Sequence, residues 1–387
     1  MKILILSDDF PPSAFGGAGR VAYNLARGLQ DAGHQVFIIT TCREKSNEGR
    51  EDYEGLNVFR IYSNFHARWR AYLGLYNPRT VSRVRRFIKE IKPDVVHAHN
   101  VHCHLSYHCL KVAKNHSRAV FLTAHDVAMF NYEKLAAQKY LENSDCRTIW
   151  LDHLKQAQKR YNPLRNVIIR YYLKYVDKIF AVSYALKDAL NQNGISNIEV
   201  IHNGINPEDW SVSLELVEGF RKKHDLQDKK VIFFGGRISA LKGSEKINQA
   251  IARVKKEIPE VFLFVIGRGT KWLTGGDLKA AYAVSEVVVT PSIYLDPFPT
   301  VNLEAMASRR PVVATCYGGS LELVRDGVTG FIINPANTEL MAEKIIDLLK
   351  NPQKAKQFGE AGFERVKKEF SLEQQVAKTI SWYLKFL

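Results

Sequence analysis

The sequence predicts an α/β protein of two doubly wound domains, each built on a parallel sheet. Short apolar runs alternate with helical patterns along the whole chain, which is typical of parallel sheets with helices on both faces. The alternation restarts near residue 230, after a polar stretch at 203–228 that suits a linker. The length of 387 residues fits about two or three domains.

In the first half of the chain, the expected strands are short runs dominated by apolar residues. They span 2–6, 36–40, 58–61, 94–98, 120–123, 178–182 and 199–201. Helical periodicity predicts helices at 19–31, 77–91, 164–175 and 184–193. The first strand has too few consecutive apolar residues for a signal-peptide core and is typical of a buried parallel strand.

The second half repeats the pattern. Its expected strands span 230–234, 261–266, 286–290, 311–314 and 330–333. Three helices are expected to follow, at 338–350, 352–368 and 372–386. Two doubly wound domains that face each other would place a cleft between two sets of strand ends.

The composition is that of an ordinary globular protein. It is 46% hydrophobic and 25% charged, which excludes wholesale disorder. The five cysteines are scattered and odd in number, so a disulfide framework is not expected and a reducing cytoplasm fits. No stretch approaches the roughly 20 apolar residues of a transmembrane helix.

The net charge of +15 predicts an anionic partner. The positive charge is concentrated in two segments, 66–92 and 153–178, in which aromatic residues are interspersed. Such segments suit an anionic membrane surface or nucleic acid. The alternative is a pair of solvated helix faces with half-buried tyrosines.

The segment 287–335 contains two carboxylates eight residues apart, Asp296 and Glu304, between apolar strands. An α/β domain builds small-molecule sites at the carboxyl ends of such strands. Each carboxylate can accept two hydrogen bonds from the vicinal hydroxyls of a sugar ring or a ribose. The segment therefore predicts a protein that binds sugars or nucleotides.

Two glycine-rich loops are candidate phosphate sites. Gly16 and Gly17 precede a predicted helix, whose N-terminus favours an anion. Residues 17–22 formally match the dinucleotide fingerprint G-x-G-x-x-A. A loop of about ten residues separates them from the first strand, and the second strand ends without an acid, which disfavours that interpretation. A plain turn is the alternative.

The second loop contains Gly236, Arg237 and Lys242 after the first strand of the second domain. Its two cations can converge on a diphosphate, Arg237 as a fork and Lys242 as a point charge. Two solvated surface charges are the alternative. His125 closes a predicted strand, where an imidazole can hydrogen-bond a sugar hydroxyl.

Five histidines crowd one region of the first domain, with two cysteines nearby. They are His97, His99, His102, His104 and His108. We expect packing or acceptor contacts here rather than a metal site, because no second set of ligands is evident. Gly318 and Gly319 precede another short helix, where backbone donors suit a phosphate or form a simple turn.

Several motifs together resemble the GT-B glycosyltransferases, most closely the retaining enzymes of glycosyltransferase family 4. They are FGGAGR at 15–20, DVVHAHN at 94–100, FAVSYALKDAL at 180–190, VIHNGIN at 200–206, FGGRISALKG at 234–243 and PSIYLDPFPTVNLEAMASRRPVVAT at 291–315. The resemblance implies two Rossmann-like domains facing a central cleft. Residues 1–205 would bind the acceptor, 206–371 would bind the donor, and a last helix in 372–387 would cross back to the first domain.

The resemblance also implies roles for single residues. Asp296, where the family has a glutamate, would contact the transferred sugar, and Glu304 would bind the ribose hydroxyls. Arg237 and Lys242 would neutralise the diphosphate, and His125 would lie near the C6 hydroxyl of the sugar. The remaining donor-binding residues would be Gly16, Gly17, Gly236, Phe298, Pro299, Thr300 and Val301.

A second departure from the family follows residues 266–269, where about 20 residues that normally help to form the base pocket are absent. The donor base, uracil or guanine, therefore stays open.

The implied activity is that of a hexosyltransferase-type enzyme. It would move a sugar from a UDP- or GDP-linked donor to a glycan or lipid-linked acceptor in the synthesis of cell-surface polysaccharide or glycoconjugates. The nucleotide sugar would be a co-substrate, and no cofactor, metal or nucleic acid would be needed. The expected location is cytoplasmic, with peripheral attachment at the inner face of the plasma membrane.

The alternative within the same fold is a nucleotide-sugar epimerase or a sugar phosphorylase. A dinucleotide oxidoreductase and a non-enzymatic nucleic-acid-binding protein are more distant rivals. The first is disfavoured by the spacing of the first glycine loop, and the second by the lack of a recognised module.

Overall fold

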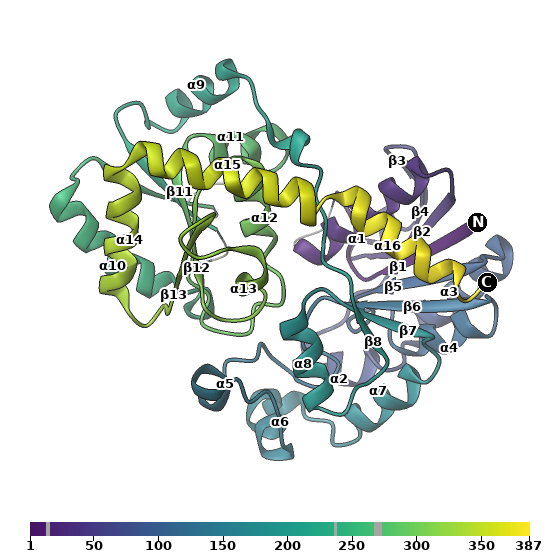
Figure 1. The fold of residues 1–387 in the computed structure, drawn as a ribbon. Helices are drawn as coiled ribbons and strands as arrows, with labels where there is room; N and C mark the ends of the chain where they lie inside the picture. The colour runs from purple at the N-terminus through teal and green to yellow at the C-terminus, as the bar shows by residue number, and fades with distance from the viewer. Residues whose placement is uncertain (13–15, 236–237, 267–272) are drawn as a thin grey trace. The chain divides into compact units, whose positions relative to one another are not determined.

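A computed structural model describes residues 1–12, 16–235, 238–266 and 273–387 of the chain (Figure 1). It divides into two compact units. Unit 1 comprises Met1–Leu135, Cys146–Asn203 and Leu372–Leu387, and unit 2 comprises Ala136–Asp145 and Gly204–Ser371. The predicted division put residues 136–145 in the first domain, whereas in the structure they belong to unit 2.

Unit 1 is built on an eight-stranded sheet in the order β3-β4-β2-β1-β5-β6-β7-β8. The strands are β1 (Lys2–Ser7), β2 (Gln35–Cys42), β3 (Gly49–Tyr53), β4 (Leu56–Tyr62), β5 (Val95–His99), β6 (Ala119–Ala124), β7 (Lys178–Ala181) and β8 (Ile198–Val200). All neighbours pair in parallel except β3 and β4. The chain order reverses at β1, which lies between β2 and β5, so ligands are expected at the carboxyl ends there.

The predicted strands of unit 1 are confirmed, and β3 was missed. The sequence of β3, GREDY, is polar, and its side chains are exposed or half-buried at the edge of the sheet. By contrast, β1 is buried along nearly its whole length because helices cover both faces of a central parallel strand. An edge strand without a buried face lacks the apolar run by which strands are recognised.

Helices cover the sheet of unit 1. They are α1 (Gly17–Asp31), α2 (Arg70–Leu73), α3 (Pro78–Ile91), α4 (His108–Lys114), α6 (Trp150–Ala157), α7 (Arg165–Leu173), α8 (Tyr184–Gln192) and α16 (Leu372–Leu384). The predicted returning helix is confirmed as α16, which packs along α1 (Figure 1). The two helices approach so closely that a Cβ at Gly28 would overlap the Val376 side chain.

Unit 2 is built on a five-stranded parallel sheet in the order β10-β9-β11-β12-β13. Its strands are β9 (Lys230–Phe234), β10 (Val261–Val265), β11 (Ser285–Thr290), β12 (Val312–Thr315) and β13 (Gly330–Ile333). All five were predicted. The chain order reverses at β9, between β10 and β11, which makes the loops after β9 and β11 the expected ligand-binding loops.

The helices described in unit 2 are α5 (Gln138–Asn143), α9 (Leu214–Lys223), α10 (Ser244–Glu257), α11 (Gly275–Ala283), α12 (Thr300–Ala307), α13 (Ser320–Leu323), α14 (Thr338–Lys350) and α15 (Pro352–Glu369). Of these, α14 and α15 were predicted, whereas α5, α9, α10 and α11 were not. The sequence predicted a linker at 203–228, but the structure has helix α9 within this stretch. Ser213 caps this helix by accepting the Leu216 N–H, and Phe220 buries its apolar side.

Candidate active site

The candidate site of unit 2 lies at the carboxyl ends of β9 and β11. These strands are parallel neighbours with Phe234 opposite Val289, so the loops that follow them begin side by side. The backbone N–H of Ile293 donates to the Leu241 carbonyl at 2.7 Å, which joins the two loops. Lys242 comes from the first loop and Asp296 from the second.

Lys242 and Asp296 form an ion pair, with 2.6 Å between Nζ and Oδ2. Both side chains are largely buried, with exposed fractions of 18% and 9%. Burial favours the neutral carboxyl, but the Lys242 charge and hydrogen bonds from Lys242, Ser292 and Tyr294 outweigh it. The pKa of Asp296 therefore lies below its ordinary value, and its carboxylate is charged at neutral pH.

A glycine turn supports the backbone of Asp296. Gly318 has a φ of +67°, and a Cβ there would overlap the Asp296 carbonyl. The N–H of Gly319 donates to that same carbonyl at 2.9 Å. Only glycine fits such a left-handed position against another backbone.

Two interpretations of this turn were left open, backbone donors for a phosphate or a simple turn, and the contacts of its two glycines favour the simple turn. The Gly319 N–H is occupied by Asp296, and the Gly318 N–H donates to the Tyr140 hydroxyl at 2.9 Å. Tyr140 is buried on α5, the segment that enters unit 2 from the first half of the chain. The sequence gives no signal for this contact because 178 residues separate its partners.

Glu304 lies on α12, whose N-cap is Pro299. The buried Tyr282 hydroxyl donates to Glu304 Oε2 at 2.5 Å. Burial raises the pKa of Tyr282, and the charge of the Glu304 carboxylate raises it further. The helix is held in place by Asn302, which accepts from Thr290 Oγ1 at 2.8 Å. One oxygen of Glu304 is thus oriented by the protein, as a carboxylate that binds hydroxyls requires.

Four other predicted donor-binding residues lie around the start of α12. Phe298 and Pro299 are buried, and Thr300 and Val301 are half-buried in the first turn of α12. Gly236 and Arg237 lie outside the described residues, so the geometry of the predicted diphosphate pair is seen only for Lys242.

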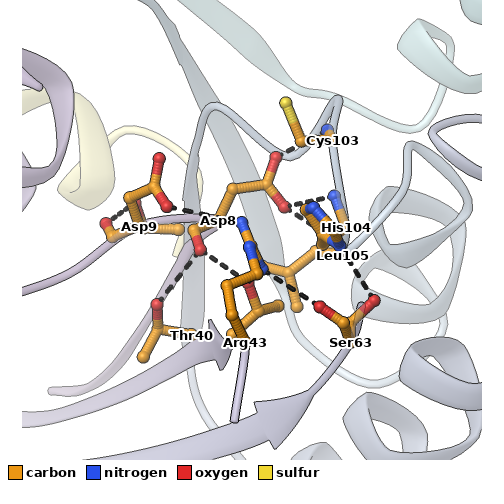
Figure 2. Close-up of polar contacts among 10 residues, drawn as sticks. Asp8, Asp9, Thr40, Arg43, Ser63, Cys103, His104 and Leu105 are labelled. Atoms are coloured by element: carbon orange, nitrogen blue, oxygen red, sulfur yellow. Dashed lines mark hydrogen bonds and ion pairs between the residues drawn. The ribbon is translucent and has the colours of Figure 1, made fainter. Parts of the chain in front are cut away.

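In unit 1, the carboxyl end of β1 is organised by Asp8. Its buried carboxylate accepts the backbone N–H groups of Cys103, His104 and Leu105 at 2.6, 2.8 and 2.7 Å. Figure 2 shows these three groups converging on Asp8. Burial raises the pKa of Asp8 to about 6, although the hydrogen bonds lower it in part. Sequence reasoning missed this residue because its partners lie far along the chain.

His125 follows β6 directly and is half-buried. Its Nε2 lies 2.9 Å from Nδ1 of the fully buried His99, and the two rings stack. Burial lowers the pKa of His125 to about 4, partly opposed by Asp126. Asp126 itself lies 3.5 Å from His102 Nε2.

The histidine cluster is a hydrogen-bonded packing element. His97 Nδ1 lies 2.6 Å from the Tyr383 hydroxyl of α16, and its Nε2 lies 2.7 Å from Thr123 Oγ1. His104 contacts Ser63, and His108 contacts Tyr172. Within the part of the chain that the structure describes, no group of three or more metal-ligating side chains could hold an ion.

Gly16 is the N-cap of α1, and Gly17 is its first residue. Both are exposed, and a Cβ at Gly16 would meet no neighbouring atom. They belong to unit 1 together with His125, whereas Lys242, Asp296 and Glu304 belong to unit 2. The structure thus brings Lys242 and Asp296 into contact within one unit.

A cavity of about 250 Å³ lies elsewhere in unit 1. Its lining includes Lys2, Asn57 and Ile91. Lys2 and Asn57 lie at the amino ends of β1 and β4, away from the carboxyl ends where Asp8 and His125 are found. It therefore does not belong to the candidate site.

Unit 1 also exposes apolar and basic side chains in two segments, residues 68–72 and 150–174, which we together call the aromatic-basic surface. Its apolar members are Trp69, Tyr72, Trp150, Leu154, Leu164, Val167 and Tyr171, and its basic members are Arg68, Lys155, Lys159 and Lys174. The Tyr72 hydroxyl donates to the Tyr161 carbonyl at 3.1 Å, which joins the two predicted basic segments. Among the described residues, no helix is long and apolar enough to cross a membrane.

Two doubly wound units, with a polar site at the switch point of each sheet and a last helix that returns to unit 1, define a GT-B glycosyltransferase fold. The chain belongs to glycosyltransferase family 4: the model of that family matches residues 15–209, and the model "Glycosyl transferases group 1" matches residues 270–365.

Curated relatives match over nearly the whole chain. An uncharacterised glycosyltransferase of Methanocaldococcus jannaschii is 26% identical, with 88% of this chain and 87% of the relative covered. The glycogen synthase of Mycobacterium tuberculosis is 23% identical, with 99% of this chain and 94% of the relative covered.

Solved structures show the same fold. Sucrose-phosphate synthase of Thermosynechococcus elongatus superposes with a TM-score of 0.74 at 18% identity, covering 99% of this chain and 98% of the other. Anabaena HepE in complex with UDP-glucose superposes with a TM-score of 0.71 at 20% identity, covering 99% and 100%. The predicted GT-B fold is therefore confirmed.

Proposed function

We propose that this glycosyltransferase transfers a hexose from a UDP- or GDP-linked sugar, with retention of configuration, to a glycan or lipid-linked acceptor. The observation that supports the proposal most is the Lys242–Asp296 ion pair at the carboxyl ends of β9 and β11, with Glu304 oriented on the next helix. One cation and two carboxylates at this edge match a diphosphate, a sugar and a ribose. A relative of the same fold, HepE, was solved with UDP-glucose.

In the proposed reaction, the glycosidic bond breaks and its electron pair moves to the diphosphate oxygen. Negative charge develops on the diphosphate, where Lys242 stabilises it with Arg237. The acceptor hydroxyl attacks from the same face of the sugar and gives its proton to the diphosphate oxygen. No resident metal or cofactor is needed in this scheme, because the positive charges of Lys242 and Arg237 are assigned to the leaving group.

An entering diphosphate would compete with Asp296 for the Lys242 ammonium. When Lys242 turns to the diphosphate, the carboxylate of Asp296 becomes available to a sugar hydroxyl. Asp296 is shorter than the glutamate of the family, so it has less reach toward the sugar. We expect it to contact the donor only after Lys242 has moved to the diphosphate.

The test uses hydrolysis of the donor, because water can replace an unknown acceptor. Purified protein is incubated with UDP-glucose or GDP-mannose after treatment with EDTA, and the first-formed anomer of the free sugar is followed by proton NMR. We expect the anomer of the donor to be retained and the rate to be unaffected by EDTA. An inverted sugar, an isomerised nucleotide sugar or a strict metal requirement would contradict the proposal.

We also propose that the aromatic-basic surface binds an anionic membrane, as an enzyme with a lipid-linked acceptor would require. Trp150 and Leu154 lie four residues apart on α6, and their exposed fractions are 62% and 41%. Residues at this spacing share one helix face. Apolar side chains that are flanked by cations suit a surface with anionic headgroups.

Flotation with vesicles tests this second proposal. Wild-type protein should float with phosphatidylglycerol vesicles but not with phosphatidylcholine vesicles. The double substitution Trp150→Ser and Leu154→Ser should abolish flotation, whereas Leu214→Ser, a still more exposed apolar site in unit 2, should not. Flotation that is absent in the wild type or unchanged in the double variant would disprove membrane binding by this surface.

A further inference from the structure

His125 and His99 face each other through one nitrogen each, and only one of these nitrogens can hold the shared proton. The distance between His125 Nε2 and His99 Nδ1 is 2.9 Å, which is a hydrogen bond. Burial lowers the pKa of both imidazoles, so both are neutral at pH 7. A neutral imidazole donates through one nitrogen and accepts through the other.

The second nitrogen of His99 decides which ring donates. His99 Nε2 is buried and has no hydrogen-bond partner among the described residues. If this nitrogen carried the proton, an N–H group would be buried without an acceptor. Orphaned N–H groups are rarer in proteins than orphaned acceptors. His99 therefore carries its proton on Nδ1 and donates it to His125.

The His99 ring cannot easily turn to escape this arrangement. It lies between His97, whose tilted ring has its centroid 4.4 Å away, and His125, whose stacked ring has its centroid 5.2 Å away. His97 is itself held by hydrogen bonds to Tyr383 and Thr123. A side chain fixed by packing and hydrogen-bonded neighbours orients its own partner reliably.

We infer that His99 is a positioning residue that fixes His125 in the tautomer with its proton on Nδ1, so that His125 offers an N–H donor to the substrate. His125 Nδ1 has no hydrogen-bond partner among the described residues, and the ring is half-buried. The ligand group it suits is an oxygen acceptor, a hydroxyl or a carboxylate of the sugar. The inference rests on the proposed function for the identity of that ligand.

The tautomer is measured directly by nitrogen NMR of protein with ¹⁵N-labelled histidine rings, recorded without ligand. Signals of His125 are assigned by their loss in His125→Gln. We expect a protonated Nδ1 and an unprotonated Nε2 for His125, and a protonated Nδ1 for His99. A protonated Nε2 on His125 would overturn the inference, whatever the enzyme's substrate.

Kinetics test the consequence for the donor. His99→Phe keeps a stacked aromatic ring but removes the N–H group that donates to His125. The value of kcat/KM for UDP-glucose or GDP-mannose hydrolysis should therefore fall about 3- to 10-fold. Affinity for the free nucleoside diphosphate should not change. His99→Gln, whose amide can donate to His125, should recover most of the loss, and His116→Phe outside the cluster is the control. An equal loss in the Phe and Gln variants would overturn the positioning role.

The two sets of results separate this inference from the proposed function. If wild-type protein neither binds nor hydrolyses a nucleotide sugar, the proposed function fails, and the role assigned to His99 in donor binding fails with it. The ligand-free spectra still decide the tautomer. If the wild type is active but His99→Phe equals it, only the positioning role is overturned.

Discussion

Lys242 and Asp296 form a buried ion pair whose two members have separate roles in the proposed reaction. A buried charge that loses its partner strongly destabilises the folded protein. The ion pair should therefore also contribute to the stability of the fold at the end of β11. The pKa of Asp296 is held down by this lysine. The charge of Lys242 is therefore the property that a substitution should remove.

Lys242→Ala should reduce kcat for donor hydrolysis about 100-fold, the loss typical of removing one group that stabilises developing charge. The physical reason is that the leaving diphosphate loses a cation. Steady-state rates of the purified variant provide the measurement. Lys255→Ala, an exposed lysine on α10, should retain the wild-type rate. Full turnover by Lys242→Ala would remove Lys242 from the mechanism.

The turn before α13 links a backbone conformation to the position of Asp296. Gly318→Ala should destabilise the protein by the left-handed strain of about 1–2 kcal/mol and by a further overlap with Asp296 of about 1–3 kcal/mol. Gly327→Ala is the matched control, because Gly327 has a φ of +70° but open space around it. Urea titration should show the larger loss for Gly318→Ala, and donor hydrolysis should fall only there. Equal losses would mean that the overlap is relieved at no cost.

Helix α5 has a position that the sequence did not predict. Tyr140 on this helix accepts the Gly318 N–H. Tyr140→Phe should leave that N–H without its partner, at a cost of about 1 kcal/mol. Amide exchange at Gly318 should then be faster, by about 5-fold. Glu142→Gln, an exposed change on the same helix, should leave Gly318 exchange unchanged, and a similar rate in both variants would contradict the assigned contact.

Elements were predictable where their own sequence buries a face. The strand at 2–6 was predicted because it is apolar and covered on both sides. The polar strand β3 was missed because it lies exposed at an edge. The position of α5 could not be predicted, because its contact with Gly318 joins residues that are 178 positions apart in the sequence.

The candidate site divides in the same way. Asp296, Glu304 and Lys242 were predicted from their spacing and their position after strands. The contacts of Asp8 with 103–105 and of His97 with Tyr383 were not predicted, since 286 residues separate the latter pair. Hydrogen bonds of this kind are determined by tertiary structure and leave no local pattern.

The molecule as a whole should be destabilised by acid because unit 1 buries neutral histidines. Burial lowers the pKa of His97, His99, His102 and His125 below 6.5, so the unfolded chain binds more protons than the folded one below that pH. Asp8 acts in the opposite direction, because its pKa is raised to about 6 in the folded state. His104 adds to the four histidines, because burial lowers its pKa to about 3. Five groups therefore oppose one, so the free energy of unfolding should fall as pH falls from 6.5 toward 4.

The measurement is proton uptake on urea unfolding near pH 5. With five histidines against one aspartate, net uptake should be about four protons, equivalent to roughly 5 kcal/mol per pH unit. Stability that is constant or rises on acidification would show that these histidines are not buried as neutral groups.

The central claim is that the carboxylates of unit 2 bind a nucleotide-diphosphate sugar, and calorimetric titration tests it most directly. UDP-glucose or GDP-mannose should bind the wild type, and Glu304→Ala should weaken that binding roughly 10- to 100-fold, as expected when hydrogen bonds to a charged group are lost. Glu343→Ala, an exposed change on α14, should bind like the wild type. Binding of neither nucleotide sugar, or equal affinity in the Glu304→Ala variant, would contradict the claim.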